Sequence, residues 1–447
     1  MKVLLFRLKP HKRTIGLQSI MICEPLELEY LAASLKGRHQ VEIVDMILEK
    51  VPLEYFLKLH QPQVVGLTGY ISHVNLIKEG AALVKGFDSQ ITVIVGGVHA
   101  EVVPEDFEDQ NIDYIVTGNG ISVFPKLLDD LESGLVKEVK KSKHIGNKEK
   151  SVPEFFPDRE LTEKYRSRYY YIFHNPCALI KTSYGCPYSC SFCFCRQITG
   201  EQYYTRDLSD VIEEIKGIKE SEIYIVDDNF LFSRERVEEF CRLLRENNIH
   251  KRFLVYGRAD FIAQHEKTIE MFAQVGLRAV IVGMETANGE ELEKYNKQSS
   301  IHVNEKAAAI LLKYGIDCYA TIILGIDWHE DDFNNLYKWL KKNNLSFVNL
   351  QPFTPLPGTP LGDQYQEQLI IPRSSFEQWD LANLVVRPTR ISVRRYYYNI
   401  LKLYFKLTLS PKSLKGNLKY GLVPNLKLSL GAGRIIWQYL LKIVKGG

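Results

Sequence analysis

The chain of 447 residues contains no run of 18 or more apolar residues, so no segment has the composition of a transmembrane helix. The amino terminus also does not contain the apolar core of a secretory signal peptide, because charged residues interrupt it at Arg7, Lys9, Lys12 and Arg13. Cysteine is scarce, and eight unevenly spaced residues do not make the framework of a disulfide-rich secreted protein. We therefore expect a globular protein of the reducing cytoplasm.

Acidic residues are missing from the last part of the chain. Between Leu381 and Gly447 there is no Asp or Glu, whereas 13 Lys and Arg residues occur. The rest of the chain carries 44 basic and 54 acidic side chains, a net charge of −10, although the whole chain is at +3. Positive charge segregated in this way predicts an anionic partner for the tail.

Two common nucleotide-binding motifs are absent. No GxGxxG follows the first predicted strand, and no GxxxxGK[ST] occurs anywhere, which argues against dinucleotide and P-loop sites. The composition, with 45% hydrophobic and 25% charged residues, is ordinary for a globular protein. Because 447 residues are too many for a single hydrophobic core, two or three domains are expected.

The most informative feature that is present is a group of three cysteines. Cys186, Cys190 and Cys193 have the spacing CxxxCxxC. Three thiolates can bind three irons of a four-iron cluster, which leaves the fourth iron open for a substrate or cosubstrate. A structural zinc site needs four ligands, commonly two CxxC pairs, and no second pair or CxxH follows here. The spacing therefore favours an iron–sulfur cluster over zinc or a buried structural role.

This motif resembles the signature of the radical S-adenosylmethionine (SAM) superfamily. The resemblance includes Phe192, and it implies a [4Fe–4S] cluster on the three cysteines, with SAM chelated to the open iron and Phe192 near the adenine. Residues similar to those of the cobalamin-associated branch occur at Asp227–Phe230, Gly283–Glu285 and Thr354–Pro360. Together the matches cover most of residues 175–365.

Residues 1–145 alternate predicted strands and helices. Strand patterns at 3–6, 41–44, 64–68, 91–95 and 114–116 are separated by helical patterns at 25–36, 53–59, 75–85 and 124–131. This alternation predicts a parallel, doubly wound sheet, whose ligands bind beyond the carboxyl ends of the strands. The candidate residues at those ends are Asp45, Thr68, Gly69, Gly96, Gly97, Gly118 and Gly120.

This half resembles the Rossmann-like cobalamin-binding domain that is fused to many radical SAM enzymes. The resemblance implies that cobalamin binds at the strand-end residues just named. Many such domains carry Asp-x-His-x-x-Gly, in which the His binds cobalt, but Asp45 is followed by Ile47 and Lys50 at the His and Gly positions. A corrin whose lower face is open or water-bound, and a scaffold that holds no corrin, are both consistent with this departure.

From residue 176 the strand–helix alternation resumes. Strand patterns at 178–182, 222–227, 253–257, 279–283, 318–324 and 346–350 predict a partial (β/α)6 barrel of the TIM type. Active groups gather at the carboxyl ends of such strands. By resemblance, five residues there contact SAM, since carboxylates suit its ammonium group and ribose, and arginine suits its carboxylate. They are Asp227, Asp228, Asn229, Arg258 and Glu285, with strand-end capping or internal salt bridges as the alternative.

We therefore expect a cobalamin-binding domain at 1–145, a linker at 146–175, a radical SAM barrel at 176–365 and a basic helical region at 366–447. In the last region Lys and Arg alternate with Tyr, Trp and Leu, which is typical of a helix on an anionic membrane surface. A helical lid over the barrel is the alternative. Nucleic-acid binding is disfavoured, because no RNA-binding module accompanies the basic residues.

The resemblance implies a cobalamin-dependent radical SAM enzyme, with C-methylation of an unactivated carbon as the favoured activity. One SAM methylates cobalamin, and a second yields the radical that takes hydrogen from the substrate. We expect a small-molecule or lipid-like substrate, an external electron donor of the flavodoxin or ferredoxin type, and low-oxygen conditions. The alternatives are an oxidative cyclase that transfers no methyl group, and a cobalamin- or cluster-based sensor.

Overall fold

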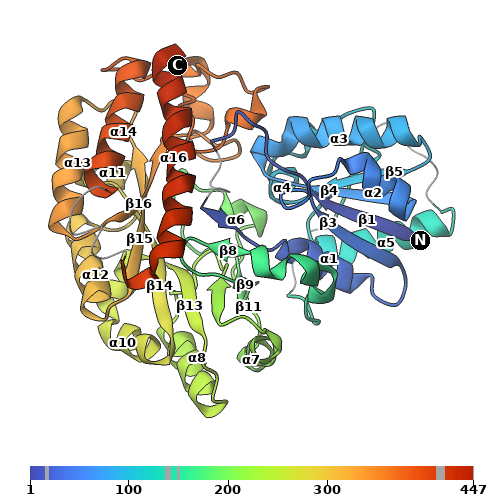
Figure 1. Ribbon diagram of the computed structural model, residues 1–447, viewed down its shortest axis with the longest axis horizontal. Coiled ribbons are helices and arrows are strands. Elements are labelled where there is room, and N and C mark those ends of the chain that lie inside the picture. Colours follow the sequence, from blue (N-terminus) through green and yellow to red (C-terminus); the bar gives the residue numbers. More distant parts are fainter. Residues whose placement is uncertain (16–19, 136–141, 148–151, 409–417, 446–447) are drawn as a thin grey trace.

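Two parallel β-sheets form the scaffold of the protein. The computed structural model describes residues 1–15, 20–135, 142–147, 152–408 and 418–445. The N-terminal sheet with its helices forms the right-hand lobe in Figure 1, and the second sheet forms the left-hand lobe together with the C-terminal helices. The α/β fold class predicted from the sequence is thereby confirmed.

The first sheet is six-stranded and wholly parallel. Its order is β3 (Gln40–Asp45), β1 (Lys2–Arg7), β4 (Val64–Thr68), β5 (Thr92–Gly96), β6 (Tyr114–Thr117) and β7 (Lys143–Gly146). The strand order reverses between β1 and β4, which is where ligands bind in such folds. The helices around it are α1 (Leu26–Ser34), α2 (Leu53–His60), α3 (Val74–Phe87), α4 (Val98–Val102) and α5 (Gly120–Glu132).

The second sheet is also six-stranded and parallel. Its order is β16 (Phe347–Pro352), β15 (Asp317–Leu324), β14 (Leu277–Glu285), β13 (Arg252–Gly257), β12 (Glu222–Ile225) and β9 (Cys177–Ile180). The connecting helices are α7 (Leu208–Gly217), α8 (Arg234–Glu246), α9 (Ala259–Gln264), α10 (Glu266–Val275), α11 (Gly289–Lys294), α12 (Ile301–Lys313) and α13 (Glu330–Lys342). Because the sheet does not close within the described residues, β9 and β16 are its edges.

Local sequence explains where the helices of this lobe begin. Asp207 accepts a hydrogen bond from the Ser209 amide at the start of α7, and Ser300 accepts one from the Val303 amide at the start of α12. These short polar side chains satisfy amide groups that have no partner inside the helix. The strands between the helices are buried on both faces, which is why they read as nearly continuous apolar runs.

Two short antiparallel strand pairs lie outside the six-stranded sheets. Strand β2 (Met21–Ile22) pairs with β8 (Tyr170–Tyr171), and β10 (Ser183–Tyr184) pairs with β11 (Tyr204–Thr205). The remaining elements of the described residues are α6 (Cys195–Ile198), the C-terminal helices α14 (Val393–Thr408) and α16 (Leu422–Lys445), and the 3-10 helices η2 (Ile71–His73), η3 (Pro104–Phe107), η4 (Arg159–Arg168), η5 (Asp363–Gln368), η6 (Phe376–Gln378) and η7 (Leu418–Tyr420). No helix among the described ranges is both long enough and apolar enough to cross a membrane.

The region predicted to be a linker contains secondary structure. Lys143–Gly146 forms the edge strand β7, which pairs with β6 and extends the first sheet beyond residue 145. Residues 159–168 then form η4, which lies between the two lobes. Neither element shows hydrophobic periodicity, because β7 is a largely exposed edge strand and η4 is held mainly by ion pairs.

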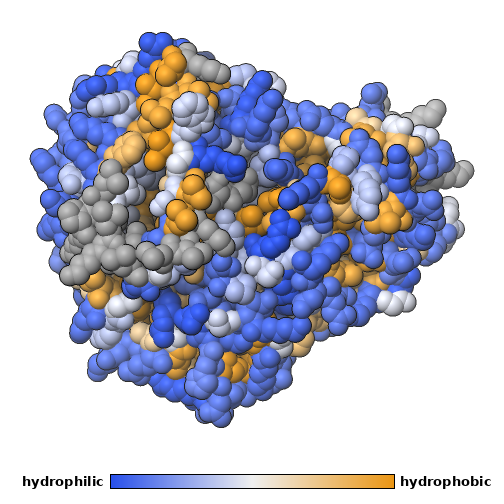
Figure 2. Space-filling model, viewed as in Figure 1, coloured by the Kyte–Doolittle hydropathy of each residue, from blue (hydrophilic) through white to orange (hydrophobic). Residues whose placement is uncertain are grey.

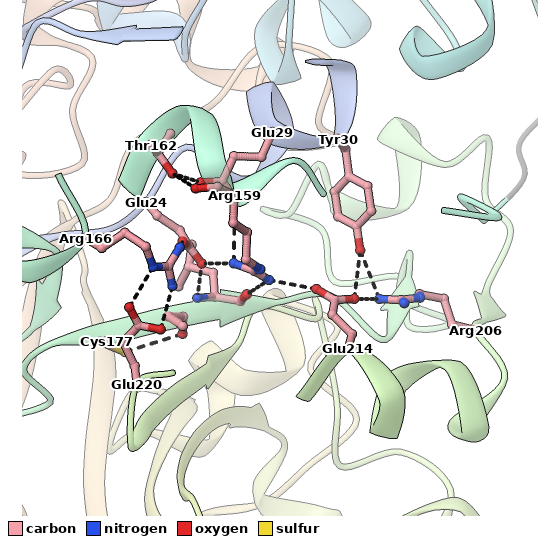
Figure 3. Close-up of polar contacts among 12 residues, drawn as sticks. Glu24, Glu29, Tyr30, Arg159, Thr162, Arg166, Cys177, Arg206, Glu214 and Glu220 are labelled. Atoms are coloured by element: carbon pink, nitrogen blue, oxygen red, sulfur yellow. Dashed lines mark hydrogen bonds and ion pairs between the residues drawn. The ribbon is translucent and has the colours of Figure 1, made fainter. Parts of the chain in front are cut away.

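A buried ionic network holds the lobes together (Figure 3). Arg159 and Arg166 of η4 bridge Glu24, which precedes α1, to Glu214 on α7 and Glu220 before β12. All five side chains are at most 15% exposed. Groups buried in this way are stable only when each charge has a partner, so the network strongly constrains the relative position of the lobes.

Glu29, which lies beside Arg159 of this network, has a raised pKa. Burial, together with the charge of Glu24, raises its pKa to about 8, although Arg159, Thr162 and Arg166 oppose the shift. Thr162 donates a hydrogen bond to one carboxyl oxygen, while the other lies 3.6 Å from Arg159 Nη1. At neutral pH this carboxyl is therefore protonated in the folded protein.

The raised pKa of Glu29 predicts a loss of stability at alkaline pH. The folded protein holds this proton up to about pH 8, whereas the unfolded chain releases it near 4.5. The contribution is therefore complete below pH 4.5 and is lost as the pH rises through 8. Between about pH 6 and pH 9, the native protein should lose roughly 2–3 kcal/mol of stability relative to Glu29→Gln. Urea unfolding of both proteins across this range checks it, and parallel curves would contradict it.

Candidate active site

The three cysteines of the motif lie on one loop at the carboxyl edge of the second sheet. We call residues 185–194, between β10 and α6, the cysteine loop. The Cys193 amide donates to the Cys190 carbonyl at 3.2 Å, and Cys186, Cys190 and Cys193 are all partly exposed. The loop is fastened at its middle, where the Ser191 amide donates to the Tyr295 carbonyl at 3.1 Å.

Asp227 and Asp228 fasten the start of the cysteine loop to the end of β12. The fully buried Asp227 accepts hydrogen bonds from the amide and hydroxyl of Thr182, both at 2.6 Å, and from the Ser183 hydroxyl at 2.7 Å. Asp228 accepts one from the Gly185 amide at 3.0 Å. These contacts occupy the Asp227 carboxylate, which favours the strand-end alternative for this residue. Asp228 keeps a partly exposed side chain.

Asn229 has an unusual environment for an amide. It is 2% exposed, and neither Oδ1 nor Nδ2 has a hydrogen-bond partner among the described residues. An unpaired buried polar group costs about 1–3 kcal/mol, so such groups are rare unless a ligand completes them. Asn229 is therefore the side chain of the Asp227–Asn229 motif with hydrogen-bonding capacity still free.

Arg258 brings positive charge to the cysteine loop. Its guanidinium lies 3.7 Å from the ring centre of Tyr188 and donates to the Lys297 carbonyl at 2.6 Å. It also bonds Asp260 at 3.0 Å and comes within 3.9 Å of Cys190 Sγ. Burial raises the pKa of the Cys190 thiol, while the charges of Lys297 and Arg258 oppose this. The contacts hold the arginine rigidly against the loop.

Glu285 forms a buried ion pair with Lys297, at 2.6 Å between Oε1 and Nζ. Burial by itself lowers the pKa of Lys297, but the charge of Glu285 holds this pKa above its usual value. Glu285 has φ +62°, in the left-handed region, and the pairing of β14 with β15 shifts register between Gly283 and Glu285. Such strained bulges re-aim side chains next to functional sites.

Phe192 on the cysteine loop and Cys195 at the start of α6 are the last two side chains of this site. The Phe192 ring packs edge-on against Tyr295, with 5.6 Å between ring centres. A hydrogen bond from Cys195 lowers the pKa of Cys193, and the same bond raises the pKa of Cys195.

At the first sheet, the carboxyl edge is closed on one side by Asp45. This fully buried carboxylate forms an ion pair with Arg7 and accepts hydrogen bonds from the Tyr169 hydroxyl at 3.2 Å and the Ile47 amide at 3.1 Å. Its lone pairs are therefore used inside the protein. Asp45 fixes the loop after β3 against the segment that enters the second lobe.

The glycines at this edge fall into two groups. Gly97 (φ +106°) and Gly118 (φ +76°) have backbone conformations that favour glycine. A Cβ on Gly97 would lie 2.4 Å from Thr68 Oγ1, so close packing within the edge requires glycine there. By contrast, no atom lies within 4 Å of the Cβ position at Gly120. That open space is suited to a flat ligand.

Gly69 and Gly96 also differ in the space around their Cβ positions. A Cβ on Gly69 would lie 2.5 Å from His73 Cβ, whereas at Gly96 the nearest atom is 3.5 Å away. His73 is partly buried, and burial together with the charge of Arg7 lowers its pKa to about 4. His73 is thus neutral at physiological pH.

Accessible tyrosines lie at both edges. Tyr70, which follows β4, is 61% exposed, and Tyr256 on β13 is 37% exposed, yet desolvation raises the pKa of both. The charges of Glu27, Cys23 and Tyr256 raise the pKa of Tyr70 further, and those of Cys195 and Asp228 act on Tyr256. The two tyrosines therefore lie near each other, between the first sheet and the cysteine loop.

Comparison with known proteins identifies both parts of the chain. The radical SAM superfamily model matches residues 180–340, and the B12 binding domain model matches residues 13–128. The hopanoid C-3 methylase of Methylococcus capsulatus is 27% identical over 85% of this chain and 75% of its own length. The bacteriochlorophyllide d C-8(2)-methyltransferase of Chlorobaculum tepidum is 29% identical, with 71% of each chain covered.

Solved structures show the same fold. The cobalamin-dependent radical enzyme OxsB, with aqua-cobalamin and S-adenosylmethionine bound, matches with a TM-score of 0.70, 16% identity, and coverage of 99% of this chain and 72% of its own. The methyltransferase TsrM from Kitasatospora setae, with cobalamin and a [4Fe–4S] cluster bound, matches with a TM-score of 0.67, 16% identity, and coverage of 98% and 99%.

These matches define an enzyme of the radical SAM superfamily. Within it, the chain belongs to the family whose members carry an N-terminal B12-binding domain, and its cofactors are a [4Fe–4S] cluster, SAM and cobalamin. The resemblance found in the sequence is thereby confirmed.

Several of the site residues predicted from the sequence lie at one edge of the second sheet, beside residues that were not predicted. Contacts link the cysteine loop to Asp228 and Arg258, as the strand-end positions predicted. Lys297, Tyr188 and Glu27 were not identified. A lone lysine twelve residues after its partner has no sequence signature, and the helical pattern of α1 assigns Glu27 to a solvated face.

The ion pair at the end of β14 depends on a glycine, which gives a testable prediction. A Cβ on Gly283 would lie 2.4 Å from Glu285 Oε1 and 2.8 Å from Lys297 Nζ. Gly283→Ala should therefore displace the pair and destabilise the protein by about 1–3 kcal/mol. Gly289→Ala is the matched control, because its Cβ would meet nothing within 4 Å. Equal melting temperatures for the two variants would contradict the prediction.

Proposed function

We propose that this enzyme is a cobalamin-dependent radical SAM methyltransferase that methylates an unactivated carbon of a small, lipid-like molecule. The observation that carries the proposal is the pair of accessible side chains Tyr70 and Tyr256, which lie near each other between the two sheets, since methyl transfer requires the substrate to lie between the two cofactors. The hopanoid methylase and the bacteriochlorophyllide methyltransferase, each similar over most of this chain, support it.

For the second sheet, we assign the cluster to Cys186, Cys190 and Cys193. The unpaired amide of Asn229 and the partly exposed Asp228 are suited to the polar groups of SAM, and the aromatic ring of Phe192 is suited to its adenine. Arg258 and Glu285 border the same edge, each held by a buried partner. Asp227 serves the site by fastening the loop.

For the first sheet, we assign the corrin to the strand ends, over Thr68, Gly69, Gly96, Gly97, Gly118 and Gly120. The open space around the Cβ position of Gly120 and the accessible side chain of Tyr70 fit a large flat ligand at these strand ends. Asp45 supports this edge through Arg7 and Tyr169 rather than through a free carboxylate. The loop after it provides no histidine for cobalt.

Bound together, the cluster and SAM supply a radical that removes hydrogen, and cobalamin supplies the methyl group. The protein shapes the space between them with tyrosine rings. Tyr224 lies 5.0 Å from Tyr171 and 5.9 Å from Tyr256 between ring centres. Such a lining excludes water and suits an apolar substrate.

Glu27 gives this region one polar side chain. It is exposed, yet desolvation raises its pKa while the charge of Arg7 opposes the shift. A carboxyl group binds a hydroxyl group of a ligand well. We therefore favour a largely apolar substrate that carries one hydroxyl group.

Methyl transfer can be distinguished from the cyclase alternative, which is favoured by 24% identity to the anaerobic magnesium-protoporphyrin IX monomethyl ester cyclase of Rubrivivax gelatinosus over 81% of this chain. The holoenzyme, reconstituted without oxygen, is given dithionite, trideuteromethyl-SAM and a total lipid extract. We expect 5′-deoxyadenosine, S-adenosylhomocysteine and a deuterated lipid. Deoxyadenosine without S-adenosylhomocysteine would overturn the proposal in favour of the cyclase.

The cluster assignment has its own test in the same assay. Cys190→Ala should lose the iron–sulfur absorption and form no deoxyadenosine, because a cluster with two thiolates is not retained. Cys318→Ala is the matched control, since Cys318 lies on β15 away from the loop. Deoxyadenosine formation by Cys190→Ala at the native rate would contradict the assignment.

The electron donor and the cellular location complete the proposal. We assign reduction of the cluster to a flavodoxin or ferredoxin in a cytoplasm with little oxygen, because an iron–sulfur cluster of low potential needs such a donor. The partly exposed cysteines leave the loop accessible for electron transfer.

We further propose that α16 rests on an anionic membrane surface. Six apolar side chains at 37–74% exposure recur with helical spacing on one face of this helix: Leu426, Leu430, Trp437, Leu440, Leu441 and Val444. Figure 2 shows hydrophobic surface gathered along α16. The opposite face packs into the core through the fully buried Tyr439.

The positive charge of the tail indicates that the surface contacted by this face is an anionic bilayer. No acidic residue occurs after Asp380, and Arg434 is exposed on the same helix. Apolar side chains together with basic ones bind interfaces that contain anionic lipids. The contact places the enzyme at the inner surface of the membrane, where apolar substrates concentrate.

Vesicle binding tests the membrane contact. The protein should sediment with phosphatidylglycerol vesicles, much less with phosphatidylcholine vesicles, and less at high salt. The double variant Leu430→Gln/Trp437→Gln should weaken binding by about tenfold or more, since each side chain loses ~1–2 kcal/mol of burial. Leu59→Gln, on α2 and 60% exposed, is the control. Equal binding of both variants, or dimerisation through α16 without vesicle binding, would contradict the proposal.

A further inference from the structure

The strand that leads into the cysteine loop lies at an open edge of its sheet. Strand β9 pairs with β12 on one side only, so the amide and carbonyl of Leu179 point away from the sheet. Open edges normally leave such groups to solvent or to another chain. In this protein both groups are bound instead by side chains from outside the sheet.

Glu24 and Arg159 are the residues that bind Leu179. The Glu24 carboxylate accepts a hydrogen bond from the Leu179 amide, and Arg159 Nη2 donates to the Leu179 carbonyl at 2.7 Å. The same Arg159 donates to Glu24 at 2.5 Å and to Glu214 at 2.7 Å (Figure 3). At this point the pair takes the place of a neighbouring strand.

A second arginine repeats this arrangement two residues further along the strand. Arg206 donates to the Lys181 carbonyl at 2.9 Å, to the Tyr30 hydroxyl at 2.9 Å and to Glu214 at 2.6 Å. Tyr30 belongs to α1 of the B12-binding domain, and Lys181 directly precedes Thr182, which Asp227 holds. A chain of buried polar contacts therefore runs from that domain to the start of the cysteine loop.

Charge makes the chain of contacts rigid. Three arginines, Arg159, Arg166 and Arg206, face the carboxylates of Glu24, Glu214 and Glu220, and their side chains are at most 15% exposed. Arg166 contacts Glu220 in a bidentate manner, and Arg159 uses one nitrogen for Glu24 and another for Glu214, so the contacts have few alternative geometries. A displacement of the B12-binding domain would leave charges unpaired, which is costly in a buried site.

We propose that Arg159 and Arg206 are positioning residues that couple the cysteine loop to the B12-binding domain and so set the separation of the cluster from the cobalamin. They touch neither cofactor-binding edge. They act through Leu179, Lys181 and Tyr30 on the strand and helix that carry those edges. The inference concerns the geometry of the holoenzyme and is independent of whether methyl transfer is its reaction.

Electron paramagnetic resonance tests the proposal without a substrate. In the reduced holoenzyme, the reduced cluster speeds the relaxation of the cob(II)alamin spin, and this dipolar effect falls steeply with distance. We expect a single, strong enhancement in the native protein. Arg159→Gln should lose it or spread it over a range, and Arg159→Lys, which keeps the charge and one donor, should restore part of it.

Two further variants keep the test decisive. Tyr30→Phe removes one hydroxyl from the chain of contacts and keeps the packing of the ring, so it should reduce the enhancement. It is the variant to measure if Arg159→Gln does not fold. Arg242→Gln is the matched control, because Arg242 also makes a double contact, with Glu239 and Glu246, but on the exposed face of α8. Folded Arg159 and Tyr30 variants that bind both cofactors and keep the native enhancement would overturn the proposal.

Discussion

The structure depends on how the unpaired backbone groups of one edge strand are hydrogen-bonded. β9 is the last strand of the second sheet, and the chain passes from it through Lys181 and Thr182 into the cysteine loop. Were the Leu179 amide and carbonyl left to solvent, the loop would begin from a fraying edge. Because Glu24 and Arg159 bind these groups, a segment from the other domain completes the sheet. The site is therefore built by both domains together, and neither lobe presents it alone.

Sequence patterns predicted the features that depend on residues close together in the chain. Hydrophobic runs located the strands of both sheets, and the CxxxCxxC spacing located the loop, because each signal lies within a dozen residues. The contacts that fix the site are non-local. Glu24 meets Leu179 across 155 positions, and Lys297 meets Glu285 through a bulge with a left-handed residue. The edge strand β7 escaped prediction because its four residues contain a single apolar side chain.

Two acidic residues show why motif matches did not determine roles. Asp45 and Asp227 stand where cofactor-binding carboxylates were expected, yet both are fully buried and bonded to their own chain. Burial without a ligand is tolerable for a carboxylate only when donors surround it, and here Arg7, Tyr169, Thr182 and Ser183 provide them. The hydrogen-bonding capacity left free is that of neighbouring Asn229, which no periodicity distinguishes from a structural amide.

The C-terminal helices reconcile the two interpretations of the basic tail. Tyr396 of α14 is buried and donates its hydroxyl to the Leu324 and Gly325 carbonyls, at the carboxyl end of β15. Tyr439 of α16 packs against Tyr397, so the pair of helices covers the second lobe as a lid. The outer face of α16 remains apolar and basic. One helix pair thus packs against the second lobe with one face and leaves an apolar and basic surface on the other, which is the surface for which we propose a membrane contact.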